Sequence, residues 1–208
     1  GRDQAHRVAH AGEGVARRRE RRAVVMGEGD GGGDLVLVAA GASAFGYGDN
    51  QPLRVRIDGD RIVRLPDHPP GIVGLAVDRR YPRRVRIVDA DAQLWESLDG
   101  GAAWAPIGVR PITTSRIVYR GAFATDDLDH VVVGASFTGA HVSRDGGATW
   151  TTATGLAPGT VPGASSAMNL AFAGADGAIV WATGINLDDG SRHVWRSTDG
   201  GVSYTDLV

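Results

Sequence analysis

A short segment that occurs three times constrains the fold of this chain more than any other feature. The copies read SLDGGAAW, SRDGGATW and STDGGVSY, and they begin at residues 97, 143 and 197. Each copy has a serine, an aspartate two positions on, two glycines directly after it, and an aromatic residue three positions past the second glycine. The copies lie 46 and then 54 residues apart, which is the period of a repeat built from about four strands.

The chemistry of each copy is that of a hairpin turn. The aspartate can accept hydrogen bonds from backbone N–H groups two residues on, and the paired glycines can adopt φ > 0 without a Cβ clash. The aromatic residue then stands on the outgoing strand, where it can pack between neighbouring sheets. We therefore predict a structural role for the repeated residues, which are Ser97, Asp99, Gly101 and Trp104, then Ser143, Asp145, Gly147 and Trp150, then Ser197, Asp199, Gly201 and Tyr204.

These turns resemble the Asp-box, or BNR, repeats of sialidase-like β-propellers, whose pattern is S-x-D-x-G-x-x-W. Two copies match fully, and the third has Tyr204 in place of tryptophan. The run LAVDRRYPRRVRIVDA at 75–90 resembles the segment before the box in xyloglucanase-type, sortilin-type and photosystem-assembly-factor propellers. The resemblance covers about residues 71–208 and implies a β-propeller. It implies no single activity, because these families share the repeat and differ in function.

We predict an all-β propeller of four-stranded antiparallel blades, with about four blades present, either alone or as a fragment of a larger propeller. The expected blades span about 23–65, 71–107, 115–153 and 167–208. The first lacks the repeat, but residues 54–65 alternate about Asp58-Gly59, a strong hairpin signal. Residues 1–22 are rich in arginine and are expected to be a disordered or helical leader. Residues 35–44 have an alternative interpretation as a signal-peptide core.

Composition excludes several classes of function. The formal charge is −2, so no global field recruits nucleic acid, and no apolar run is long enough for membrane insertion by a helix. Cysteine is absent, which excludes disulfides, thiolate catalysis and cysteine-ligated metals. We expect no metal and no cofactor. Composition leaves the compartment and the oligomeric state open, and the family resemblance suggests an extracytoplasmic or secreted protein.

An up-and-down order of strands decides which loops share a rim of the propeller. The three repeated turns then lie on one rim. The loops between the second and third strands of each blade lie on the other rim, together with the connections from one blade to the next. In the propellers that this chain resembles, ligands bind on that second rim. The aspartates expected there are Asp89, Asp91, Asp188 and Asp189, the candidate acid and base of a glycosidase, which needs two carboxyl groups about 5 to 10 Å apart. The simpler interpretation is that these residues cap solvated turns.

A run of arginines follows the first strand of the second expected blade. It contains Arg79, Arg80, Arg83, Arg84 and Arg86, and only Asp78 is adjacent to offset the charge. The run is either a solvated loop or a surface that binds an anionic patch on a partner protein.

These observations favour a non-catalytic recognition or scaffold propeller that binds a protein or a glycan on the second rim. One alternative is a glycoside hydrolase, sialidase-like or xyloglucanase-like, or a fragment of one. The sequence has no R-I-P motif of the kind expected early in a sialidase. Another alternative is an assembly factor that would bind its partner through the rim that carries this arginine run. Catalysis is left open.

Overall fold

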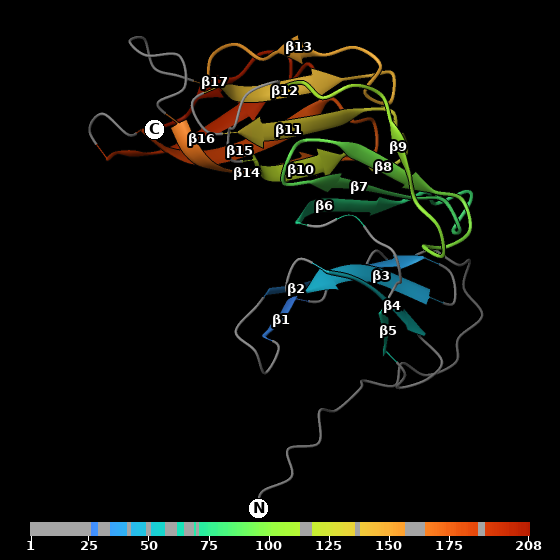
Figure 1. Cartoon of the computed structure of the whole chain (residues 1–208). Coiled ribbons are helices and arrows are strands. Elements are labelled where there is room, and N and C mark those ends of the chain that lie inside the picture. Colours follow the sequence, from blue (N-terminus) through green and yellow to red (C-terminus); the bar gives the residue numbers. More distant parts are fainter. Residues whose placement is uncertain are drawn as a thin grey trace, which may run out of the picture.

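The computed structural model describes residues 26–28, 34–40, 43–48, 51–56, 62–64, 69, 71–112, 118–135, 138–156, 165–186 and 190–208. These residues form four antiparallel sheets and no α-helix (Figure 1). The expected leader, residues 1–22, lies outside the described residues. In the described part of the chain no helix is long and apolar enough to cross a membrane.

Every sheet is a simple meander in which each strand pairs with the next one in sequence. The first sheet contains β1 (Met26–Glu28), β2 (Asp34–Ala40), β3 (Ser43–Gly48), β4 (Gln51–Arg56) and β5 (Ile62–Arg64). The second contains β6 (Ile72–Val77), β7 (Val85–Asp89), β8 (Leu94–Ser97) and β9 (Ala105–Ile107). The third contains β10 (Val118–Phe123), β11 (Val131–Ala135), β12 (Gly139–Ser143) and β13 (Thr151–Thr152). The fourth contains β14 (Ser165–Ala173), β15 (Ile179–Asn186), β16 (Arg192–Ser197) and β17 (Thr205–Asp206).

The first sheet differs from the expectation because it has five strands. Strand β3 was not predicted, since its sequence SAFGYG contains two glycines, which weaken a strand interior. Pairing with β2 on one side and β4 on the other stabilises it despite this low propensity. The pairs Leu53↔Arg64 and Val55↔Ile62 centre the β4–β5 connection on residues 58 and 59, as the hairpin signal predicted. Those two residues themselves lie outside the described part.

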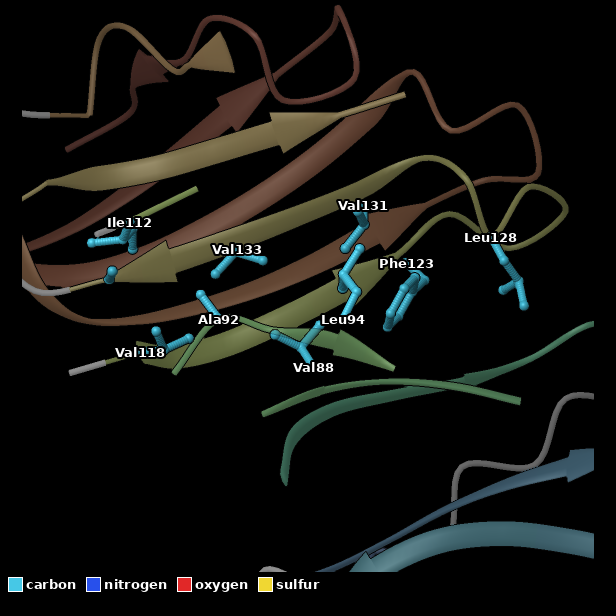
Figure 2. Close-up of a cluster of buried hydrophobic side chains, with 10 residues drawn as sticks. Val88, Ala92, Leu94, Ile112, Val118, Phe123, Leu128, Val131 and Val133 are labelled. Carbon is cyan, nitrogen blue, oxygen red and sulfur yellow. The ribbon is translucent and has the colours of Figure 1, made fainter. Parts of the chain in front are cut away.

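The core consists of layers between sheets. Side chains from β7 and β8 meet side chains from β10 and β11 in one layer (Figure 2). A second layer joins the third sheet to the fourth around Val132, Val142, Val180 and Trp195. Strands β7, β11 and β12 are therefore buried at every residue. The apolar sequence of β11 predicted this burial, whereas β7 also buries Arg86 and Asp89, and β12 also buries His141 and Ser143. Strand β15 instead alternates between buried and exposed residues from Val180 to Thr183.

The first strands of successive sheets, β6, β10 and β14, run next to one another. The approach of β6 to β10 is close enough to require glycine on both strands. A Cβ atom built on Gly74 would overlap the backbone of Gly121, and one built on Gly121 would overlap the side chain of Val88. These glycines thus set the spacing between the second and third sheets.

Candidate functional site

The serine of each repeated turn is buried, and its hydroxyl makes hydrogen bonds within the turn. Its hydroxyl donates to the aspartate Oδ1 two residues on, at 2.8 Å for Ser97, 2.8 Å for Ser143 and 2.7 Å for Ser197. The same oxygen accepts the N–H of the second glycine at 2.8 Å in all three turns. The six turn glycines have φ between 69° and 97°, a region that L side chains rarely adopt.

The aspartate carboxylates accept backbone N–H groups three or four residues on, rather than two residues on as the sequence predicted. Asp99 accepts from Ala102 and Ala103 at 2.8 and 3.0 Å, and Asp199 accepts from Val202 and Ser203 at 3.0 and 2.9 Å. The difference arises because the two left-handed glycines lengthen the turn, so the amides that point back at the carboxylate lie between the second glycine and the outgoing strand.

Hydrogen bonds lower the pKa of all three turn aspartates. The bonds from Thr149 hold the pKa of Asp145 at about 2. Burial raises the pKa of Asp199, but the bonds from Ser203 and Ser197 outweigh it and bring the value to about 2. The backbone N–H of Ala103 and the hydroxyl of Ser97 lower the pKa of Asp99. These groups are therefore ionised turn caps at neutral pH and are poor candidates for proton transfer.

Each turn also docks on the loop between the first two strands of its own sheet. The N–H of Gly100 donates to Arg83 O at 2.8 Å, that of Gly146 to Asp129 O at 3.0 Å, and that of Gly200 to Ala178 O at 2.7 Å. We call the edge formed by these loops and turns the turn rim. The shared edge agrees with the rim assignment made from an up-and-down strand order.

Contacts between sheets also involve the turns. The Trp150 indole N–H donates to Val109 O, in the connection that follows β9 of the preceding sheet, at 2.7 Å. His130 Nε2 lies 2.7 Å from Gly200 O of the following sheet, and Arg144 donates to Asp199 O at 2.6 Å. Burial lowers the pKa of His130. The turns therefore join neighbouring sheets as well as neighbouring strands.

The arginine run on the turn rim is more neutralised than its sequence suggests. Arg86 is buried on β7, and its guanidinium contacts Glu96 at 2.8 Å and Asp129 at 2.6 Å. Arg84 contacts the same Glu96 at 2.8 Å, which makes Glu96 the centre of the group. Burial raises the pKa of Glu96, but the two guanidinium groups lower it below its ordinary value.

Arg79 is paired as well, with Asp126 at 2.9 Å, and Arg84 also reaches Asp78 at 3.3 Å. Sequence reasoning counted only Asp78, because Glu96, Asp126 and Asp129 come from β8 and from the loop of the next sheet. Within the described residues, Arg80 and Arg83 are the two members of the run that form no ion pair.

These two arginines line an open pocket of about 700 Å³ on the turn rim. We name it the arginine pocket. Its lining consists of Arg80, Tyr81, Pro82, Arg83, Arg84, Glu96 and Leu98. Tyr81 and Leu98 are 67% and 69% exposed. Sequence reasoning did not single them out, although two large apolar side chains in turn positions were a usable signal.

The candidate acid and base residues near the opposite rim are only partly described. Asp89 is buried, and its carboxylate accepts N–H groups from Asp91 and Gln93 at 2.9 Å each and from the Trp95 indole at 2.8 Å. Both of its oxygens are thus used by the β7–β8 turn. Asp91 is exposed and lies 3.8 Å from Arg110. Asp188 and Asp189 lie outside the described residues, so the expected pairing across the rim stays a prediction. No group of His, Cys, Asp and Glu suited to a metal ion occurs among the described residues.

Comparisons with known proteins give the fold class and one sequence relative. No family model matches the sequence. The relative is the dispase autolysis-inducing protein of Streptomyces mobaraensis, which is 39% identical over 172 residues, 79% of this chain and 46% of that protein. The chain thus spans about half the length of the curated relative that it matches.

Two solved structures illustrate the likeness in fold. The extracellular domain of BT4673 from B. thetaiotaomicron, described as a one-component system, aligns with a TM-score of 0.54 at 10% identity, over 89% of this chain and 27% of that one. The GH74 xyloglucanase from Xanthomonas campestris aligns with a TM-score of 0.43 at 18% identity, over 86% of this chain and 37% of that one. The four meander sheets and the first of these likenesses define an all-β fold of the β-propeller class.

Proposed function

We propose that this chain is a recognition propeller that binds a protein through the arginine pocket, and that its repeated turns are Asp boxes that fix the shape of that rim. The observation that carries the proposal is the pairing of two exposed apolar side chains, Tyr81 and Leu98, with two arginines that have no ion-pair partner among the described residues. Tyrosine and arginine are the residue types that most often dominate binding energy at protein interfaces.

The charges around the pocket indicate an acidic partner. Arg79, Arg84 and Arg86 are already neutralised by carboxylates, so the remaining field comes from Arg80 and Arg83 at the pocket edge. A partner segment with a carboxylate beside an apolar side chain would fit both parts of the lining. The sequence predicted a ligand on the opposite rim, and residues 113–117, 136–137, 157–164 and 187–189, which the sequence assigned to that rim, lie outside the described part. The turn rim is favoured because the arginine pocket lies there.

A protein partner is favoured over a glycan by the name of the relative, which ascribes to that protein an action on dispase. Dispase is therefore the first probe, and an extracytoplasmic location is proposed with it. The glycosidase alternative has less support, because the carboxylate of Asp89 is used up by its own turn.

The test measures association of the chain with dispase at several salt concentrations. The double variant Arg80→Gln/Arg83→Gln should associate more slowly and with a flatter salt dependence, because exposed charges act over about 8 Å at physiological ionic strength. A matched control, Arg192→Gln/Arg196→Gln on the fourth sheet, changes the net charge equally and should associate like the parent. Absence of dispase binding, or equal slowing in both double variants, would contradict the proposal.

The apolar half of the pocket is tested separately. Leu98→Ser should speed dissociation, because it removes exposed apolar area from the contact. Leu207→Ser is the matched control, since Leu207 is a leucine of similar exposure, 52%, far along the chain. Identical dissociation rates for the two variants would remove Leu98 from the interface.

A further inference from the structure

A second constellation lies on the fourth sheet, at the end of β16 opposite to its repeated turn. Ser191 Oγ is 2.7 Å from His193 Nε2, and His193 Nδ1 is 2.7 Å from Asp206 Oδ2. Ser191 directly precedes β16 and His193 is the second residue of that strand, and the contact between their side chains shows that both point the same way. Asp206 reaches them from β17. It faces Trp195 in the pairing register, and the N–H of Leu207 donates to Val194 O at 2.9 Å.

The hydrogen bonds fix where the imidazole proton lies. An ionised carboxylate only accepts, so the bond to Asp206 places the proton of the neutral ring on Nδ1. The other ring nitrogen, Nε2, then carries a lone pair, and the Ser191 hydroxyl donates to it. The second carboxylate oxygen of Asp206 accepts the Val208 N–H at 3.2 Å, which holds the carboxylate in place. This is the arrangement that a general base needs in order to activate a serine.

Packing holds the histidine ring without closing it off from solvent. The ring stacks on the fully buried Trp195, with centroids 5.3 Å apart and planes 17° apart. The side chains of His193 and Asp206 remain 13% and 29% exposed. A Cβ atom added to Gly190, the residue before Ser191, would meet none of the described residues within 4 Å, so the described part of the chain leaves this side of Ser191 open.

We propose that Ser191, His193 and Asp206 form a nucleophilic relay that accepts an acyl group from a carboxylic ester. Ser191 Oγ bonds to the carbonyl carbon while its proton moves to His193 Nε2. The bond from carbon to the leaving oxygen breaks, and the alcohol departs with that proton. Water, deprotonated by the same nitrogen, then attacks the acyl group, so the carboxylic acid is released and the serine hydroxyl is restored. Asp206 is a positioning residue, since it acts through the ring. This activity is separate from the proposed protein binding, which involves the second sheet.

The experiment exposes the full chain to a fluorophosphonate probe and locates the modified serine by peptide mass spectrometry, with p-nitrophenyl acetate hydrolysis measured in parallel. We expect modification at Ser191. Ser203 is an internal control, because its hydroxyl bonds directly to the Asp199 carboxylate with no imidazole between them. His193→Gln should slow labelling and hydrolysis by about 100-fold, the lower end of what general-base catalysis contributes.

Asp206→Asn should slow both reactions while leaving the thermal midpoint nearly unchanged, because an amide favours the wrong ring tautomer, and Asp206→Glu should restore part of the rate. Labelling of Ser191 in the parent chain tests the proposal even where a variant folds poorly. No labelling of Ser191, labelling equal to that of Ser203, or labelling that is unchanged in His193→Gln each overturns it.

Discussion

At the scale of single residues, we expect the buried serine of each repeated turn to contribute more to the free energy of unfolding than the aspartate two positions on. Ser197 is fully buried and satisfies the Gly201 N–H, which would otherwise be buried without a partner. Ser197→Ala should therefore reduce the free energy of unfolding by about 1 to 3 kcal/mol. Thr198→Ala, one position on and exposed, should change it by less than about 0.5 kcal/mol. Urea denaturation of the two variants measures the difference, and equal values would show that the serine bonds are dispensable.

The turn aspartates make stability depend on pH in a direction that follows from their pKa values. The pKa of Asp145 and that of Asp199 are about 2 in the folded chain, below the ordinary value of about 3.9 in an unfolded one. The folded state therefore favours the ionised form, so this stabilisation is complete above about pH 5 and is lost as the pH falls towards 2. We expect the denaturation midpoint to fall between pH 5 and pH 2.5. The fall should be smaller in Asp199→Asn, and a parent midpoint that stays constant over this range would contradict the assignment.

At the scale of elements, the contact between β6 and β10 should respond differently to an added methyl group on each strand. In Gly74→Ala the methyl group meets the backbone of Gly121, whereas in Gly121→Ala it meets the Val88 side chain. We expect each to destabilise the chain by about 1 to 3 kcal/mol. In a Val88→Ala background the effect of Gly121→Ala should shrink and that of Gly74→Ala should not. A double-mutant cycle by denaturation measures this coupling, and equal coupling for both glycines would place the steric contact elsewhere.

The elements also show which features of the fold and of the candidate sites can be predicted from the sequence and which cannot. The repeated turns predicted β8, β12 and β16 together with the strands around them, because turn chemistry is local and is written in adjacent residues. The burial of Arg86 was missed, since its acidic partners Glu96 and Asp129 lie on other strands. The relay on β16 was missed for the same reason, because the strand register alone brings Asp206 to His193. Local chemistry can thus be read along the chain, but partners set by pairing between strands cannot.

At the scale of the whole molecule, one cross-strand pair shows whether the face of each sheet is buried against the next sheet or exposed to solvent. In the second strand of each of the last three sheets, the residue that pairs with the turn serine is followed by Arg86, Val132 or Trp181. The cross-strand partner of that following residue is Glu96, Val142 or Arg196. In the second sheet this pair forms ionic contacts with the next sheet, and in the third it is buried in the apolar layer. In the fourth sheet Trp181 is 38% exposed, with the Arg196 guanidinium 5.9 Å from the centre of its ring.

Burial between sheets, rather than side-chain size, should therefore decide the effect of truncation at this position. Val132→Ala leaves a cavity in the layer between the third and fourth sheets and should reduce the free energy of unfolding by about 2 kcal/mol. Trp181→Ala removes a much larger side chain, but it should reduce the same quantity by less than about 1 kcal/mol, because the ring is exposed and loses only its contact with Arg196. Denaturation of the full chain carrying each single change measures both values. The reverse order would mean that the exposed face of the fourth sheet is covered by another part of the protein, and that the layered core extends beyond the sheets described.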